Sequence, residues 1–178
     1  MKDEITCAGW QQYLSQSVGV AIWVRIDEQR LDLYCAGVLE KQYSVSTASR
    51  GMGNEPDSYC TPSGLHQICD RFGDGEPVGR VFRHRCATRQ IAQIETRAVP
   101  TGQDLITTRI LWLAGAEKAN TGRCSTKERY IYIHGTPEEG LIGQPVSHGC
   151  IRMRNADILE LYPEIAVGTP VYVSLDGG

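Results

Sequence analysis

The sequence has little that would point to a nucleic-acid or membrane partner. Its 178 residues carry 18 lysines and arginines against 21 acidic residues, so the net charge of −3 provides no basic surface for nucleic acid. The N-terminus lacks the charged-then-apolar pattern of a secretion signal, and the apolar run from Val18 to Val24 is too short to cross a bilayer. The sequence therefore predicts a cytoplasmic protein without membrane association, or a periplasmic one if a longer chain carries it for export.

Disulfide and metal signals are also missing, although the chain has seven cysteines. Their number is odd and no two form a CxxC pair, so the spacing predicts neither a disulfide framework nor a zinc ribbon, and no cofactor is expected. His66 and His84 have no neighbouring residues in the sequence that suggest a catalytic or metal site, and both are expected on the surface. Six cysteines are expected to be small buried side chains in a protein from a reducing compartment. These six are Cys7, Cys35, Cys60, Cys69, Cys86 and Cys124.

The fold is predicted from short alternating segments that are separated by turn residues. Tyrosine (8) outnumbers phenylalanine (2), which suits strands with one wet face. The chain is expected to be mostly β, a two-sheet β-sandwich or open barrel with one or two short helices, in a single domain over residues 1–178. Residues 1–17 are an extension with an amphipathic helix, Asn155 is expected to cap a second helix at 156–162, and residues 86–103 show no period. Strands are expected at 18–26, 30–35, 38–46, 65–72, 78–85, 105–113, 129–134 and 171–174.

The most informative stretch is Tyr-Ile-Tyr-Ile-His-Gly-Thr at 130–136, followed by Ser-His-Gly-Cys-Ile-Arg-Met-Arg-Asn at 147–155. Cysteine is a strong nucleophile that needs a base to form its thiolate at neutral pH, and histidine is the usual base. His134 closes an alternating run typical of a strand, which can hold a catalytic side chain rigidly. Cys150 is therefore predicted to be the nucleophile and His134 its base, with direct proton transfer by His148 the less favoured alternative.

The residues around the cysteine indicate a turn suited to acyl transfer. Glycine lets a substrate approach the main chain closely, so successive N–H groups of His148, Gly149 and Cys150 can hold an oxyanion. Arg152 and Arg154 follow on alternate positions, and a guanidinium fork suits a substrate carboxylate. Arg152 is predicted to bind that carboxylate, and Arg154 is expected on the surface.

These residues resemble the YkuD-type L,D-transpeptidase catalytic domain. The match lies in His-Gly-Thr at 134–136 and Ser-His-Gly-Cys-Ile-Arg-Met at 147–153, where two histidines, a cysteine and their glycines recur at fixed spacing. Many members of the family carry asparagine where this chain has Arg152. The similarity covers residues 18–174 in all. Its upstream parts are the segments 29–34, 43–47 and 61–65.

The resemblance implies a mostly antiparallel two-sheet fold with the site at one edge, and a role for the Gly135 carbonyl in orienting His134. It also implies acyl transfer on peptidoglycan stem peptides or muropeptides, where Cys150 attacks the bond between the L-centre of a diamino acid and a terminal D-residue. With water as acceptor, the enzyme would be an L,D-carboxypeptidase that releases terminal D-Ala from tetrapeptides in peptidoglycan recycling. That is the first expectation for a cytoplasmic protein. With an amine as acceptor, it would be an L,D-transpeptidase that forms cross-links or exchanges D-amino acids.

Other interpretations of the same residues stay open. His134, His148 and Cys150 are residue types that bind zinc, so a zinc-binding module is an alternative, although no fourth ligand is evident. A non-enzymatic peptidoglycan-binding domain with a vestigial site is a third class, against which the intact histidine and cysteine argue. Ser147 and Thr136 are expected to bond either the substrate or the loop backbone.

Overall fold

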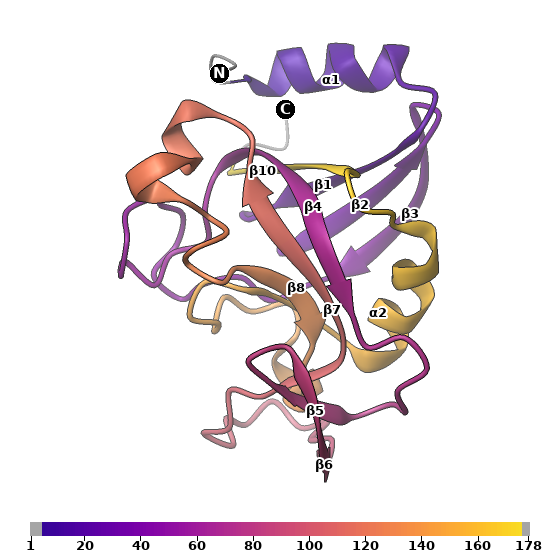
Figure 1. Ribbon diagram of the computed structural model, residues 1–178, viewed down its shortest axis with the longest axis vertical. Coiled ribbons are helices and arrows are strands. Elements are labelled where there is room, and N and C mark those ends of the chain that lie inside the picture. Colours follow the sequence, from indigo (N-terminus) through magenta and orange to yellow (C-terminus); the bar gives the residue numbers. More distant parts are fainter. Residues whose placement is uncertain (1–4, 176–178) are drawn as a thin grey trace.

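The protein is described here by a computed structural model that covers residues 5–175, and strands dominate it (Figure 1). The prediction of a mostly β fold with two short helices is confirmed. The strands are β1 Val20–Arg25, β2 Arg30–Cys35, β3 Val38–Ser44, β4 Gly64–Phe72, β5 Arg80–Arg83, β6 Cys86–Ile91, β7 Ile106–Gly115, β8 Tyr132–Gly135, β9 Ile151–Met153 and β10 Pro170–Ser174.

The strands form a mixed sheet with the order β3-β2-β1-β10-β4-β7-β5-β6, from which β8 and β9 branch at β7. Strands β1, β2 and β3 make the expected antiparallel meander, and Gln29 adopts a left-handed conformation (φ 47°) in its first turn. Two pairs, β1–β10 and β8–β9, are parallel. Because β7 pairs with both β5 and β8, the sheet divides at this strand.

Two α-helices flank the sheet, α1 Cys7–Gln16 and α2 Asn155–Leu161, and Figure 1 shows them on different sides of it. Thr6 caps α1 by accepting a hydrogen bond from the Gly9 N–H at 3.2 Å. The helix expected in the N-terminal extension is therefore present from Cys7 onward, and the first four residues of the extension lie outside the described range. In the described part of the chain, no helix is long and apolar enough to span a membrane.

The start of α2 differs from the prediction that Asn155 caps this helix. Asn155 lies inside the helix, and Arg154 occupies the cap position. The Asn155 Oδ1 accepts from the Thr107 hydroxyl at 2.7 Å, while its Nδ2 donates to the Thr136 carbonyl at 2.8 Å. A carboxylate from elsewhere, Glu139, accepts from the Asn155 N–H at 2.7 Å. Asn155 therefore ties α2 to β7 and to the end of β8, and a residue distant in sequence satisfies the helix start.

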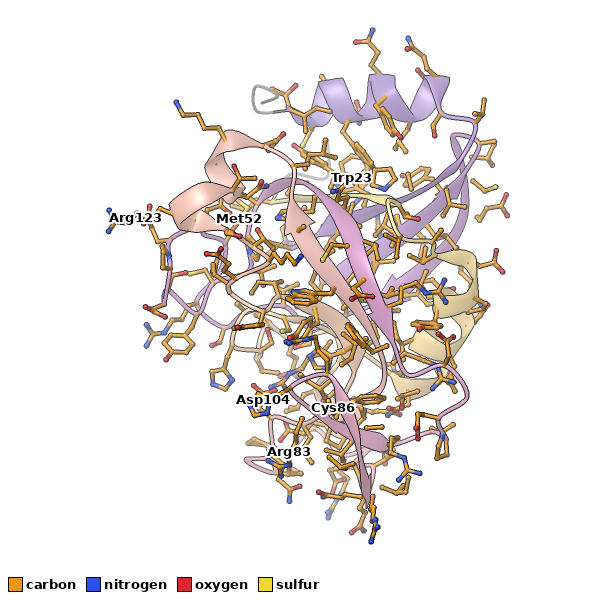
Figure 2. All side chains as sticks on the ribbon, in the orientation of Figure 1. Trp23, Met52, Arg83, Cys86, Asp104 and Arg123 are labelled. Carbon is orange, nitrogen blue, oxygen red and sulfur yellow. The ribbon has the colours of Figure 1, made fainter. Side chains whose placement is uncertain are left out.

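The hydrophobic core is divided into three clusters. The largest lies between the sheet and α2 and contains apolar side chains of eight strands and that helix. A second, with Trp10 and Trp23, lies beneath α1 (Figure 2). The third is small and contains Ile110 and Tyr132, with Cys150 packed against it. The predicted nucleophile thus lies at the edge of an apolar cluster.

Several elements carry no clear sequence signal. Strand β6 lies in the segment that lacks a period, and most of its residues are exposed, so no apolar alternation marks it. Strand β9 has three residues, all buried, because it packs between β8 and the core. The polar segment before β8 contains two of the four short 3₁₀ helices of the described residues. These are η1 Lys118–Asn120, η2 Gly122–Cys124, η3 Glu139–Leu141 and η4 Tyr162–Glu164.

Candidate active site

The parallel pair β8–β9 brings the two predicted catalytic residues to one face of the sheet. Its register pairs Ile133 with Ile151 and His134 with Arg152. Since Ile133 and Ile151 belong to the main core, strand alternation turns His134 and Arg152 to the opposite face, together with Cys150 just before β9. Cys150 and His134 therefore occupy diagonal positions on neighbouring strands, where Cα atoms lie roughly 7–8 Å apart and side chains can meet.

The Cys150 thiol lies against the backbone at the start of β8. Its Sγ accepts from the Tyr132 N–H at 3.4 Å and lies 3.6 Å from the Tyr130 carbonyl oxygen. Burial of the sulfur raises the pKa of Cys150 to about 12, an effect that the Tyr132 N–H partly offsets. The residue as a whole stays partly exposed, so a substrate can reach it. At neutral pH the thiol is therefore protonated and needs a base at the moment of attack.

His134 is held as a neutral imidazole with one nitrogen fixed. Its side chain is buried, and Nδ1 lies 2.8 Å from the Gly135 carbonyl oxygen, the contact that the family resemblance implied. Burial lowers the pKa of His134 to about 4; the Gly135 carbonyl and Asp104 act against this, while Arg152 adds to it. A Cβ at Gly135 would lie 2.7 Å from Asn155 Oδ1, so only glycine fits here. Because Nδ1 donates to a carbonyl, Nε2 is left as the proton acceptor.

The turn that carries the nucleophile is braced by its own hydrogen bonds. The Ser147 hydroxyl donates to the Cys150 carbonyl at 2.6 Å and accepts from the Gly149 N–H at 3.2 Å. The Thr61 hydroxyl donates to the Gly149 carbonyl at 3.0 Å. Gly149 has a φ of 133°, a region that residues with a Cβ rarely adopt. Because the Gly149 amide is engaged, the N–H groups of His148 and Cys150 are the better candidates for an oxyanion hole.

The two hydroxyl residues expected at the site serve the loop backbone. Thr136 is buried, its hydroxyl accepts from the Glu138 N–H at 3.2 Å, and its own N–H donates to the Met153 carbonyl at 3.1 Å. Ser147 is buried as well, and its hydroxyl is used within the turn. Of the two alternatives open from the sequence, these contacts favour backbone bonding over substrate bonding.

Arg152 lies at the site, but its guanidinium is already paired. The side chain is only 3% exposed; Nη1 donates to Glu138 at 3.1 Å and Nη2 to Asp104 at 2.5 Å. This contradicts the expectation that Arg152 binds a substrate carboxylate, because two carboxylates of the chain itself occupy its fork. Arg154, by contrast, is partly exposed near Asp157, as expected for a surface residue.

His148 lines the site from its exposed side. It is 64% exposed, and its Nδ1 lies 2.7 Å from Asp104 Oδ2. Its Nδ1 is thus held by a carboxylate, whereas that of His134 is held by a backbone carbonyl. A pocket of about 370 Å³ lies beside Asp104. Asp104 is labelled on the lower left of Figure 2. The pocket is lined by Ala98, Pro100, Gly102, Asp104, Glu138, Leu141, Gln144, Val146, His148 and Arg152.

The geometry gives no support to the zinc alternative. Over residues 5–175, no group of three or more His, Cys, Asp or Glu side chains is arranged to hold a metal ion. The Nδ1 atoms of His134 and His148 are turned to different partners, the Gly135 carbonyl and Asp104.

The other cysteines do not occupy the core. None of the seven forms a disulfide within residues 5–175, Cys35 and Cys86 are exposed, and the remaining five are partly exposed. The expectation of six fully buried thiols is therefore wrong. The Cys150 sulfur accepts from a backbone N–H, whereas the sulfur of Cys60, which also contacts the backbone, lies against two carbonyl oxygens.

The family follows from comparison with known proteins. Residues 19–173 match the family model of the L,D-transpeptidase catalytic domain, YkuD. The chain belongs to the L,D-transpeptidase family. YqjB of Bacillus subtilis (strain 168), assigned as an L,D-transpeptidase, is 41% identical over 66 residues, which make up 36% of this chain and 34% of that protein. YbiS of Escherichia coli (strain K12), assigned likewise, is 51% identical over 43 residues, 24% of this chain and 14% of that protein. The matched stretches thus span about a third or less of these relatives.

Solved structures of other L,D-transpeptidases show the same fold. The enzyme from Xylanimonas cellulosilytica superimposes with a TM-score of 0.55 at 16% identity, over 89% of this chain and 61% of that one. An L,D-transpeptidase from Mycobacterium smegmatis gives a TM-score of 0.53 at 19% identity, over 87% of this chain and 58% of that one. The β-sandwich architecture is therefore shared across widely diverged sequences.

Two acidic residues at the site of this L,D-transpeptidase domain were not predicted from the sequence. Asp104 joins Arg152 to His148, and Glu138 binds Arg152 while its Oε1 accepts from the Thr101 N–H at 2.6 Å. Glu138 follows the His-Gly-Thr motif closely, which is a usable signal. Asp104 lies in a segment without periodicity and has none.

Proposed function

We propose that this L,D-transpeptidase domain is a cysteine acyl-transfer enzyme that acts on peptidoglycan stem peptides, at the bond between the L-centre of the diamino acid and the terminal D-residue. The supporting observation is the parallel register of β8 and β9, which puts Cys150 and His134 on one face. There, no group among residues 5–175 bonds to Nε2 of His134, and that nitrogen is the acceptor a thiol requires.

The proposed reaction starts from a neutral pair. Burial raises the pKa of Cys150 and lowers that of His134, so the thiol proton moves to Nε2 only as sulfur attacks the carbonyl carbon. The N–H groups of His148 and Cys150 stabilise the oxyanion. When the tetrahedral intermediate collapses, the imidazolium returns its proton to the leaving amine. The terminal D-amino acid departs, and a thioester on Cys150 remains.

The acceptor of the acyl group decides between the two named activities. Water can reach the thioester because Cys150 is partly exposed, and His134 would then act as base a second time. This is the L,D-carboxypeptidase outcome, which we take as the first candidate. The pocket beside His148 supports the second candidate, an L,D-transpeptidase with an amine acceptor. Asp104 and Glu138 line that pocket together with Arg152, and two carboxylates against one guanidinium leave a negative charge that attracts an ammonium group.

A product analysis separates these candidates. The purified domain is incubated with a stem tetrapeptide, with and without an excess of a different D-amino acid, and the products are followed by mass spectrometry. A carboxypeptidase gives the tripeptide and free D-Ala in both mixtures, whereas a transpeptidase gives the exchanged tetrapeptide in the second. An intact tetrapeptide in both mixtures would refute the proposed function.

We also propose a reducing compartment as the working environment. The exposed thiols of Cys35 and Cys86 support this, because such thiols persist where disulfides do not form. Fractionation of cells followed by titration of free thiols in the recovered protein tests the location.

A further inference from the structure

A cluster of aromatic rings and one arginine lies directly beside the nucleophile. The two backbone groups that contact Cys150 Sγ belong to Tyr132 and Tyr130. The rings of both tyrosines lie about the indole of Trp112, with centroids 5.9 Å and 6.0 Å away. Arg85 covers this group: its Cζ lies 4.4 Å from the Trp112 centroid and 5.4 Å from that of Tyr130, and its Nη1 donates to the Tyr132 hydroxyl at 3.0 Å. The cluster is therefore connected to the sulfur through the first residues of β8.

The backbone of this cluster is unusual. Strands β5 and β6 are joined by a two-residue turn, His84 and Arg85, with φ values of 48° and 67°. Such turns favour asparagine and glycine, because a Cβ is unfavourable in the left-handed region. Tyr130 also lies there, with a φ of 56°. Three residues with side chains are thus held in a costly conformation, and two of them belong to the cluster.

The charge on the cluster has no counterpart in the protein. Over residues 5–175, no carboxylate forms an ion pair with Arg85, nor with Lys127, whose Nζ lies 5.3 Å from the Trp112 centroid. Arg152, by contrast, is paired through both Nη atoms with Glu138 and Asp104, although no group among residues 5–175 bonds to its buried Nε. The protein as a whole is acidic, with a net charge of −3, so a pair of unmatched cations beside the reactive sulfur is a local feature.

A guanidinium that stacks on aromatic rings keeps its N–H donors free at its edge. These donors match the two oxygens of a carboxylate, and stacking fixes the plane in which they point. In the proposed reaction, the D-residue that leaves Cys150 carries the free C-terminal carboxylate of the peptide. That group lies within one residue of the carbonyl that sulfur attacks. The cluster at the start of β8 is a cationic surface that can receive it, whereas Arg129, another cation near the sulfur, donates to the backbone carbonyls of Gly53 and Cys60.

We propose that Arg85, held by Trp112 and Tyr130, binds the C-terminal carboxylate of the stem peptide beside Cys150. This inference rests on the proposed function, because it takes the peptide as substrate. It assigns the carboxylate to Arg85 in place of the buried Arg152.

Binding can be measured without turnover because of the placement of the three tryptophans. Trp10 and Trp23 are buried, at 0% and 1% exposure, whereas Trp112 is partly exposed. A ligand on the cluster therefore changes mainly the fluorescence of Trp112. Cys150→Ala protein is titrated with the stem tetrapeptide as the free acid and as the C-terminal amide. The free acid is expected to bind about tenfold more tightly, the scale of one charge-assisted pair.

The variant that tests Arg85 should keep its turn. Arg85→Asn removes the charge, and asparagine tolerates a positive φ. Arg83→Asn, on the same hairpin and exposed, is the matched control. In the Cys150→Ala background, Arg85→Asn is expected to weaken free-acid binding about tenfold, to the level of the amide, while the control leaves both peptides unchanged. Melting temperatures show that both variants are folded.

The alternative outcomes are distinct. If Arg85→Asn weakens the free acid and the amide equally, or weakens neither, Arg85 does not bind the carboxylate and the inference is overturned. If neither peptide binds to Cys150→Ala protein, the inference is overturned as well. Cleavage of the same tetrapeptide by the unmodified protein then shows separately whether the proposed function stands.

Discussion

Two histidines of this domain, His66 on β4 and His134 on β8, have closely similar surroundings. Both are buried, with 0% and 1% exposure. Each turns Nδ1 to the carbonyl of a glycine, His66 to Gly64 at 2.9 Å and His134 to Gly135 at 2.8 Å. Burial lowers the pKa of both to about 4, so both are neutral at pH 7. They differ in the second nitrogen: Nε2 of His66 lies 3.0 Å from the Thr126 hydroxyl, whereas no group among residues 5–175 bonds to Nε2 of His134.

The comparison shows that a lowered pKa does not by itself identify a general base. His66 belongs to a closed polar network in which Thr126 and Asn120 use its remaining nitrogen. His134 has the same fixed tautomer, but its free nitrogen is on the face that carries Cys150. One arrangement stabilises the fold, and the other leaves a proton acceptor beside a thiol.

The largest difference between the two histidines is expected in catalysis. Asparagine can keep the contact to the glycine carbonyl while it removes Nε2. His134→Asn should therefore lower the turnover of a stem tetrapeptide by at least about 100-fold, the usual scale for a lost general base. His66→Asn should leave turnover unchanged while the protein is folded.

His66→Asn is expected to lower the stability of the protein and not its activity. It removes the closer partner of the Thr126 hydroxyl and leaves it only the Asn120 carbonyl at 3.4 Å, so the free energy of unfolding should fall by about 1–3 kcal/mol. Denaturant unfolding and initial rates on the same two preparations check both halves of the comparison. Equal loss of activity in the two variants would remove the distinction between them.

Arg152 offers a second way to test the surroundings of His134. It pairs across the strands with His134 and is buried against Glu138. Arg152→Ala leaves the Glu138 carboxylate buried without its cation, so the free energy of unfolding should fall by about 3 kcal/mol. Arg154→Ala, at an exposed position, should change it by less than about 0.5 kcal/mol. Urea unfolding of both variants checks this, and a stability loss as small as that of Arg154→Ala would mean that the pair is not buried in solution.

The sequence predicts the surroundings of His134 better than those of His66. Cys150, His134 and Gly135 follow from local pattern, because strand alternation and a glycine-flanked motif fix their placement within a few residues. His66 was expected on the surface, and the structure shows it buried. The reason is that its network is assembled from the 3₁₀ segment some sixty residues later, which no local period reveals.

The fold shows the same division between local and long-range information. The mostly β class and the presence of both helices are readable because each depends on short-range alternation, although the start of α2 is satisfied by Glu139 and not by the predicted cap. The corrected role of Arg152 depends on Asp104, 48 residues away, and on Glu138. Alternation correctly places Arg152 on the side of Cys150, but it contains nothing about which carboxylates reach it from other loops. Arg85 likewise meets Tyr132 only through the division of the sheet at β7.

Both histidines should make the folded protein less stable as the pH falls. Each has a folded pKa of about 4 against an unfolded value of about 6.5, so the unfolded state binds more protons between these values. Their contribution to stability is present above pH 6.5 and is lost as pH falls toward 4. The slope between pH 6.5 and 5 should average about 1 kcal/mol per pH unit for each histidine, below the limit of about 1.4 because the unfolded state is only half protonated at pH 6.5. Denaturant unfolding at stepped pH should show this slope halved in His66→Asn. An unchanged slope would mean that His66 is accessible to protons in the folded state.

The smallest effect is expected in the chemistry of the resting thiol. Alkylation by iodoacetamide reports the thiolate that is present before any substrate binds. Because the pKa of Cys150 is raised to about 12 and His134 is neutral, little thiolate exists at pH 7, and no imidazolium is there to stabilise it. Cys150 should therefore be modified more slowly than the exposed Cys35 and Cys86, as followed by mass spectrometry of each cysteine peptide. His134→Asn should change the Cys150 rate by no more than about twofold. A pronounced slowing in that variant would show that His134, unlike His66, is charged in the resting enzyme and holds an ion pair with the sulfur.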